Sequence, residues 1–251
     1  MSKVLIGYTG FVGSNLLEQD NYDVLINSKN CDELRNKHFD RIVCAGVSAV
    51  KWKANKFPEE DLANINKLID VLSTVTTDKF VLISTVDVYN VLTNANEDTI
   101  CTDNTQAYGK NRLYFEEWCK SHFKHVLIVR LPGLFGNNLK KNVIFDLLHD
   151  NCLDMINPDS SFQYYYLKNL TNDIKKAESK NINLINLFTE PIKTQEIIDL
   201  FFPNKVVGEN KNTEIRYDLY TKYAELNNHT GNYLYSKQEI LEYLKEFINA
   251  Q

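Results

Sequence analysis

Two hydrophobic patterns alternate along the first half of the chain. Short runs of apolar, often β-branched residues are typical of buried strands, and between them lie segments whose apolar residues recur at helical spacing. One such segment, residues 58–72, opens with three acidic residues, which are favoured at a helix N-terminus. The strand-like runs are residues 4–7, 23–26, 41–45, 80–84 and 125–131. This repetition predicts an α/β fold, a doubly wound parallel sheet with helices on both faces.

The pattern changes after Gly136, where the expected elements become shorter. They are helical patterns at 143–148, 194–202 and 236–248, an aromatic run at 162–166 and an apolar run at 182–188. We therefore predict a larger domain at residues 1–136 and a small C-terminal α/β lobe at residues 137–251, interleaved with the sheet of the larger domain.

Composition limits the classes of protein that remain. The 251 residues are 43% hydrophobic and 24% charged, which supplies a core and excludes a disordered chain. The formal net charge of −5 argues against nonspecific nucleic-acid binding. The five cysteines form no C-x-x-C pair, so neither a disulfide framework nor a metal site is predicted. No apolar stretch approaches the ~18 residues of a membrane span, so we expect a cytoplasmic protein without a membrane partner.

The first predicted strand leads into a glycine-rich turn that is followed by a helical pattern. Residues 7–13 read G-Y-T-G-F-V-G, a G-x-x-G-x-x-G motif. Glycines in this context let the backbone approach a pyrophosphate at a helix N-terminus, where free N–H groups and the helix dipole favour anions. The motif predicts a Rossmann-type site for NAD or NADP. The residues expected to contact the cofactor here are Gly7, Thr9, Gly10, Phe11, Val12 and Gly13.

The end of the second strand is the usual place for a residue that senses the adenosine ribose. Here that place reads Asn27-Ser28-Lys29. An acidic residue would repel a 2′-phosphate, whereas small polar residues beside a lysine accept one. The segment therefore favours NADP over NAD, with Lys29 as an ordinary solvated loop residue as the alternative.

Three further motifs follow in order. Residues 84–89 read S-T-V-D-V-Y at a strand end, residues 108–112 read Y-G-K-N-R at a helix start, and residues 130–136 read R-L-P-G-L-F-G. Together with the glycine loop, these motifs resemble the extended short-chain dehydrogenase/reductases, the NAD-dependent epimerase/dehydratase group. The resemblance covers residues 1 to about 140. The run A-G-V-S-A-V at 45–50 is similar to the UDP-galactose 4-epimerase branch.

The resemblance implies a catalytic role for Tyr108, which would exchange a proton with a substrate oxygen held by Thr85, while a hydride moves to or from the nicotinamide. A tyrosine with an ordinary pKa near 10 acts as a base only beside positive charge. In relatives, the nicotinamide and a lysine four residues later supply that charge. The resemblance also implies cofactor contacts from Ala45, Gly46, Val47, Tyr108, Arg112, Leu131 and Pro132.

The chain departs from this pattern at Arg112, which stands in place of the family's lysine. Four residues apart on a helix, Tyr108 and Arg112 share a face, so the guanidinium could supply the charge and bind ribose hydroxyls. Arginine is planar and bulkier than an ammonium group, so the exchange is not neutral. Asp87 is a further catalytic candidate as a base. Its alternative role is a backbone hydrogen bond at the strand end.

The small lobe is expected to hold a nucleotide-sugar substrate. Lys140, Lys141 and Asn142 precede a predicted helix and are candidates for its diphosphate, and Gln163 lies among aromatic residues that could face a base or sugar. A solvated turn and ordinary sheet packing are the alternatives. The leading functional hypothesis is NAD(P)-dependent reduction of a nucleotide-activated keto-sugar. The alternatives are a 4-epimerase with tightly bound NAD and a non-catalytic dinucleotide-binding relative, and a homodimer is possible among such proteins.

Overall fold

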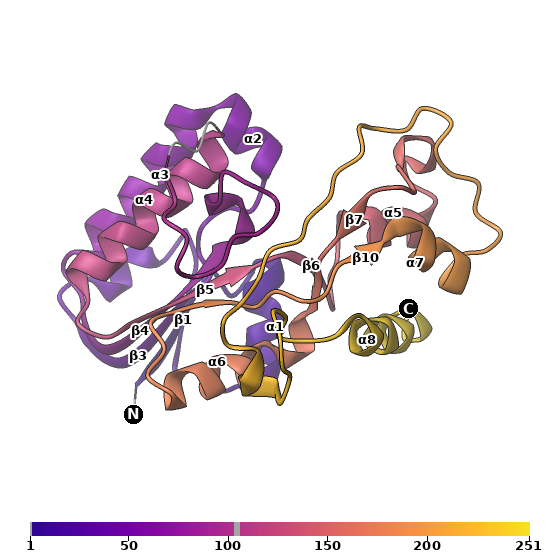
Figure 1. Cartoon of the computed structure of the whole chain (residues 1–251). Helices are drawn as coiled ribbons and strands as arrows, with labels where there is room; N and C mark the ends of the chain where they lie inside the picture. Colours follow the sequence, from indigo (N-terminus) through magenta and orange to yellow (C-terminus); the bar gives the residue numbers. More distant parts are fainter. Residues whose placement is uncertain (1, 103–105) are drawn as a thin grey trace. The chain divides into compact units, whose positions relative to one another are not determined.

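The computed structural model describes residues 2–102 and 106–251 (Figure 1). The chain folds into two compact units. Unit 1 comprises Met1–Asn90, Thr99–Leu131 and Leu170–Ile185, and unit 2 comprises Val91–Asp98, Pro132–Asn169 and Asn186–Gln251. Residues 170–185 therefore belong to unit 1, and residues 91–98 belong to unit 2. A single boundary at residue 136 separates neither of these segments from its neighbours in the sequence.

Unit 1 is built on a six-stranded sheet with the strand order β2-β1-β3-β4-β5-β9. Strand β1 pairs in parallel with β2 and β3, and β4 pairs in parallel with β3 and β5. The strands are β1 (Lys3–Ile6), β2 (Val24–Ile26), β3 (His38–Cys44), β4 (Thr76–Thr85), β5 (Val126–Leu131) and β9 (Leu184–Asn186). The order reverses beside β1, so the predicted doubly wound α/β sheet is confirmed. Ligands of such sheets bind beyond the carboxyl ends of the strands at this reversal.

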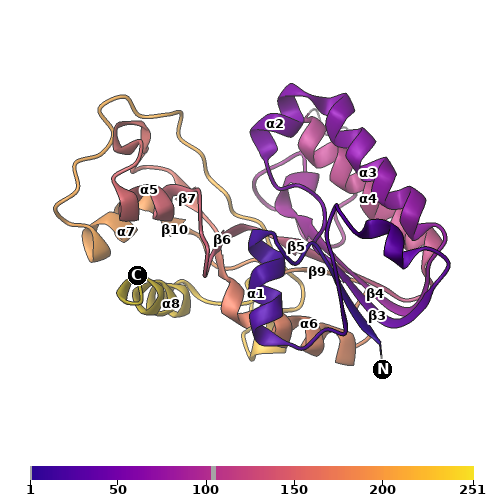
Figure 2. The same cartoon turned by 180° about the vertical axis from the view of Figure 1, so that it is seen from behind.

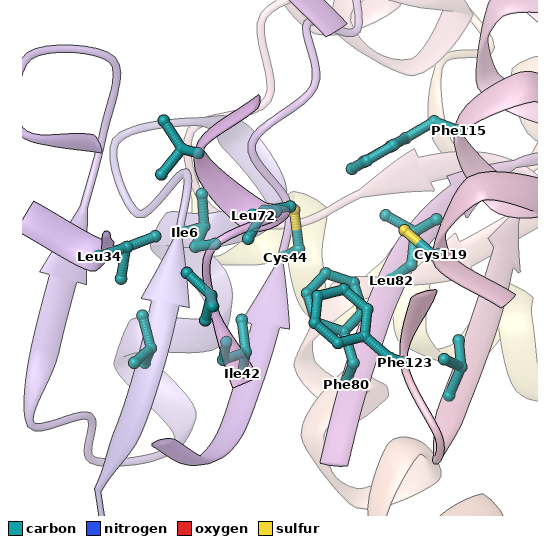
Figure 3. Packing of buried hydrophobic residues seen from close by; sticks show 14 of the residues in the cluster. Ile6, Leu34, Ile42, Cys44, Leu72, Phe80, Leu82, Phe115, Cys119 and Phe123 are labelled. Atoms are coloured by element: carbon teal, nitrogen blue, oxygen red, sulfur yellow. The ribbon is translucent and has the colours of Figure 1, made fainter. Parts of the chain in front are cut away.

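Helices cover both faces of the unit 1 sheet (Figures 1 and 2). Helices α3 and α4 lie side by side on one face, and α1 and α6 lie on the other. On the α3–α4 side, apolar residues of helices and strands interlock, and the rings of Phe80 and Phe123 stack with centroids 4.2 Å apart (Figure 3). Burying each such side chain contributes about 1.5–3 kcal/mol. The helices are α1 (Phe11–Gln19), α2 (Lys51–Lys56), α3 (Pro58–Leu72), α4 (Ala107–His122) and α6 (Leu170–Ser179).

A buried charged pair ties α4 to the sheet. Arg130 of β5 donates from Nε and Nη2 to Glu116 of α4 at 3.1 and 2.6 Å. The Ser84 hydroxyl of β4 donates to the same carboxylate at 2.5 Å. All three side chains are buried, and a buried pair of this kind fixes geometry because removing either partner leaves an uncompensated charge. Glu116 therefore anchors the middle of α4 to β4 and β5.

Unit 2 consists of short elements around two small sheets. Strand β6 pairs with β8, and β7 pairs with β10. Helix α8 begins with a capping box in which Ser236 and Glu239 bond each other's backbone N–H groups, as the S-x-x-E spacing predicts. The elements are β6 (Gly133–Phe135), α5 (Val143–His149), β7 (Ser161–Phe162), β8 (Tyr164–Tyr166), β10 (Ile192–Lys193), α7 (Thr194–Phe201) and α8 (Lys237–Asn249). Single turns of 3₁₀ helix are η1 (Cys31–Leu34), η2 (Val86–Val88), η3 (Leu153–Met155), η4 (Leu167–Asn169) and η5 (Ala224–Asn227).

Among residues 2–102 and 106–251, the structure contains no helix that could span a membrane. No group of three or more His, Cys, Asp or Glu side chains in them is placed to hold a metal ion.

Candidate functional site

The glycine loop connects β1 to α1 at the carboxyl end of the unit 1 sheet. Gly7 has a φ of +86°, and a Cβ atom there would lie 2.3 Å from the carbonyl oxygen of Ala45. A Cβ atom on Gly13 would lie 2.0 Å from the carbonyl oxygen of Gly7. Both distances are far below van der Waals contact, so both positions require glycine for packing, and Gly7 requires it for its backbone conformation as well.

The start of α1 is open to an anion. The helix is preceded by Gly10, which has no side chain to cap it, and its first turn holds no acidic residue. The first amides of a helix have no intrahelical acceptor, and the helix dipole adds positive potential there. Thr9 and Gly10 are exposed, and Phe11 and Val12 are half-buried, so solvent reaches this turn. These features fit the pyrophosphate of a dinucleotide.

The segment after β3 packs directly against the glycine loop. Its Ala45 N–H donates to the carbonyl oxygen of Ile6 at 2.9 Å, and the Ala45 carbonyl oxygen is the group nearest to Gly7. Gly46 is exposed, and Val47 is half-buried. The structure therefore brings together the two segments, 7–13 and 45–47, that the sequence assigns to the cofactor.

The turn after β2 uses Asn27 for its own structure. The Asn27 amide nitrogen donates to the hydroxyl of Tyr8 at 3.2 Å, and its Oδ1 accepts from the Lys29 N–H at 2.8 Å. Asn27 thus shapes the turn, while Ser28 and Lys29 are exposed. Residues 27–30 carry no carboxylate that would repel a 2′-phosphate.

Two hydroxyl groups meet at the ends of β4 and α4. Thr85 is the last residue of β4, and Tyr108 is the second residue of α4. The Thr85 hydroxyl is one of the groups that lower the pKa of Tyr108. The Tyr108 N–H donates to Asn55 Oδ1 of α2 at 2.9 Å. Leu131 lies beside Thr85 in the sheet register. Tyr108 is 7% exposed and Thr85 is half-buried, so the phenol is the more fully withdrawn from water of the two.

Arg112 is enclosed by partners from its own unit. Its Nη2 donates to Asp61 Oδ1 of α3 at 2.9 Å, its Nη1 donates to Asp61 Oδ2, and Nη2 also donates to the Ser48 carbonyl oxygen. The guanidinium carbon lies 4.0 Å from the centroid of the Tyr108 ring, a cation–π contact. Arg112 is 5% exposed. To bind ribose hydroxyls as expected, the guanidinium group would have to exchange hydrogen bonds that it already makes to Asp61 and Ser48. The Asp61 carboxylate also compensates the charge of Arg112.

The pKa of Tyr108 is raised above its ordinary value. Burial is the largest cause, because it disfavours the phenolate. The carboxylates of Asp87 and Asp61 raise this pKa further, whereas Arg112 and the hydrogen bond with Thr85 lower it. At neutral pH, Tyr108 is therefore a neutral phenol that carries its proton.

Asp87 lies beside these hydroxyl groups in η2. Its N–H donates to Thr85 Oγ1 at 3.2 Å, and its Oδ2 lies 3.4 Å from the same oxygen. Lys51, the first residue of α2, donates from Nζ to Asp87 Oδ1 at 2.6 Å. Neither Lys51 nor Asp61 is identified by the sequence motifs. Asp61 is one of three acidic residues in the first turn of α3. From the sequence, this position indicates only a favourable interaction with the helix dipole.

The predicted substrate residues lie in unit 2. Lys140 and Lys141 are exposed, and Asn142 caps α5 by accepting from the Phe145 N–H at 3.1 Å. Gln163 is 2% exposed. Its Nε2 donates to the carbonyl oxygens of Thr189 and Leu219, and its Oε1 accepts from the Leu219 N–H. This contradicts the prediction that Gln163 offers its amide to a substrate, because every hydrogen bond of the amide that the structure shows holds unit 2 together. Pro132, a predicted cofactor contact, also lies in unit 2, where it is the first residue of the segment Pro132–Asn169.

Unit 2 also contains a cavity of about 180 Å³. Apolar side chains predominate in its lining, and the polar ones include Asn157, whose Nδ2 donates to the Asn212 carbonyl oxygen at 2.8 Å. Residues of α5 lie next to a distant loop there, so no local motif indicates it. The lining residues are Val143, Asp146, Cys152, Met155, Ile156, Asn157, Ser160, Phe162, Asn212, Thr213 and Ile215.

The chain belongs to the NAD dependent epimerase/dehydratase family. The model of that family matches residues 21–151, slightly more than half of the chain. The match begins after the glycine loop, so the loop is identified by its own geometry. No curated protein matches the chain in sequence.

Solved structures of the same fold come from enzymes with different reactions. UDP-glucose 4-epimerase of Thermotoga maritima has a TM-score of 0.76 at 13% identity, covering 99% of this chain and 98% of that one. UDP-glucuronic acid 4-epimerase of Bacillus cereus, in complex with UDP-glucuronic acid and NAD, has a TM-score of 0.74 at 17% identity, covering 100% and 99%. dTDP-4-dehydrorhamnose reductase of Yersinia enterocolitica has a TM-score of 0.68 at 15% identity, covering 99% of each chain. These likenesses establish the fold and leave the reaction to be argued from the site.

Proposed function

We propose that the chain is an NAD(P)-dependent reductase that acts on a keto group of a nucleotide-activated sugar. The observation that carries this proposal is the buried side chain of Tyr108 beside Thr85, a phenol that is protonated at neutral pH. Reduction requires a proton donor at the carbonyl oxygen, whereas oxidation of an alcohol requires a base. A tyrosine that is protonated at neutral pH is suited to the first role.

We assign the following roles to residues of unit 1 and to the cofactor. A bound nicotinamide dinucleotide supplies the hydride. Thr85 Oγ1 holds the substrate oxygen by a hydrogen bond, and Tyr108 Oη gives its proton to that oxygen as negative charge develops. Arg112, fixed by Asp61, lies against the Tyr108 ring and sets its position. Burial of the Tyr108 side chain limits the access of water to its hydroxyl group.

The cofactor is proposed to lie along the glycine loop and residues 45–47, with its pyrophosphate at the start of α1. Ser28 and Lys29 are exposed after β2 and would face the adenosine ribose, which favours NADP. Substrate binding is assigned to unit 2, where Lys140 and Lys141 supply positive charge and the cavity beside α5 supplies an apolar site. A homodimer and a cytoplasmic location stay predictions.

A second function, 4-epimerisation with retained NAD, is favoured by the run at 45–50, which is similar to the UDP-galactose 4-epimerase branch. An epimerase uses its tyrosine alternately as base and acid, so the NAD positive charge would have to lower the pKa of Tyr108. A third, non-catalytic dinucleotide binding, is favoured by Arg112, whose charge is compensated by Asp61.

Cofactor binding separates these possibilities. We expect the purified protein to release no tightly held dinucleotide and to bind NADPH reversibly, more tightly than NADH, in calorimetric titrations. Copurified NAD that survives dialysis would instead indicate the epimerase, because that reaction regenerates its cofactor within one cycle. If neither reduced nor oxidised dinucleotide binds, the proposed function is wrong.

A further inference from the structure

Lys51 connects a separate helix to the Thr85–Tyr108 pair. It is the first residue of α2, and its Nζ donates to Asp87 Oδ1 at 2.6 Å. The Asp87 side chain is 18% exposed and that of Lys51 is 39% exposed. The other carboxylate oxygen of Asp87 faces Thr85 Oγ1 at 3.4 Å. The ammonium group of Lys51 is thus linked to Thr85 through one carboxylate.

Three charged groups act directly on the Tyr108 phenol, and a fourth acts through one of them. Arg112 lies on its own helix, Asp61 comes from α3, Asp87 from η2, and Lys51 from α2 pairs with Asp87. The positive charge of Arg112 is compensated by the Asp61 carboxylate, which accepts two hydrogen bonds from the guanidinium group. The balance of charge at the phenol therefore depends on whether the Asp87 carboxylate is itself compensated.

We propose that Lys51 is a positioning residue of the active site, which acts through Asp87 and offsets the negative charge that Asp87 places near Tyr108. The ion pair with Lys51 fixes the Asp87 carboxylate to which the Thr85 hydroxyl donates, so that the Thr85 oxygen is held in place near Tyr108. The pair also limits repulsion between Asp87 and the negative charge that forms as Tyr108 loses its proton. This inference rests on the proposed function for its catalytic consequence, but not for its effect on the phenol.

The first test requires no turnover. Lys51→Met leaves Asp87 without this cation, so we expect the ionisation of Tyr108 to move to higher pH than in the wild type. Isotope-labelled tyrosine followed by NMR reports this titration, with the Tyr108 resonance identified by its absence in Tyr108→Phe. Lys51→Arg keeps the charge and should restore the wild-type titration. Lys51→Met combined with Asp87→Asn should also restore it, because the carboxylate that needs compensation is gone.

The second test is kinetic. If the proposed function holds, Lys51→Met should lower kcat roughly three- to tenfold, as expected for a partly exposed ion pair that acts indirectly, and should move the basic limb of the pH profile to higher pH. The matched control is Lys53→Met in the same helix, whose ammonium pairs with exposed Glu60 and should change neither property.

An unchanged Tyr108 titration in Lys51→Met overturns the inference, as does a shift that persists in the Asp87→Asn background. A wild-type protein that transfers no hydride but shows the expected titration shifts would contradict the proposed function and leave the role of Lys51 standing. The two failures are therefore distinguishable.

Discussion

Tyr108→Phe is expected to lower the rate of hydride transfer about 10²- to 10⁴-fold, the usual contribution of a positioned acid or base. The substitution removes only the phenolic hydroxyl. The ring that packs against Arg112 is retained, so helix α4 and the cofactor site should be unchanged. Single-turnover absorbance measurements with NADPH report the rate, and calorimetry reports cofactor affinity, which we expect to stay at the wild-type value.

Tyr114→Phe is the matched control for this experiment. Tyr114 lies on the same helix, is 46% exposed and donates its hydroxyl proton to Asn66 at 3.3 Å, away from Thr85. It should keep full activity. A Tyr108→Phe protein with a near-normal rate would show that another group protonates the substrate oxygen.

Asp61→Asn is expected to destabilise unit 1 by about 3 kcal/mol. The side chains of Asp61 and Arg112 are 9% and 5% exposed, so the neutral amide leaves a guanidinium buried without its counter-charge. Asn111 Nδ2 also donates to Asp61, at 2.8 Å, and this contact would be disturbed as well. The free energy of unfolding can be followed by tryptophan fluorescence during urea denaturation, because both tryptophans, Trp52 and Trp118, lie in unit 1.

Asp70→Asn supplies the comparison on the same helix. Asp70 also pairs with an arginine, Arg35, but its side chain is 70% exposed, so the pair should contribute less than about 1 kcal/mol. Equal losses from the two variants would mean that Arg112 finds water or another acceptor. Its assignment as the group that fixes the Tyr108 ring would then be wrong.

The parallel sheet and its helices could be predicted because their signals are local. Alternating apolar runs and helical spacing require only neighbouring residues, and the glycine loop and the Thr85 and Tyr108 motifs are short. The structure accordingly places Thr85 near Tyr108 and the loop at 7–13 beside residues 45–47.

The partners of these residues could not be predicted, because they depend on contacts between distant segments. Arg112 meets Asp61 from 51 positions earlier, and Lys51 meets Asp87 across 36 positions. Gln163 fails as a substrate residue for the same reason, since its amide is used by backbone atoms up to 56 positions away. The motif identified the position of Arg112, but only the fold shows how its charge is used.

Transfer of deuterium from the cofactor is the most direct test of the proposed reaction. Stereospecifically deuterated NADPH and NADH would be incubated with the protein and a panel of nucleotide-activated keto-sugars, and the products analysed by mass spectrometry. We expect deuterium on the reduced sugar carbon with the wild type and almost none with Tyr108→Phe. A protein that binds the cofactor yet transfers no deuterium to any of these sugars would contradict the assignment as a reductase.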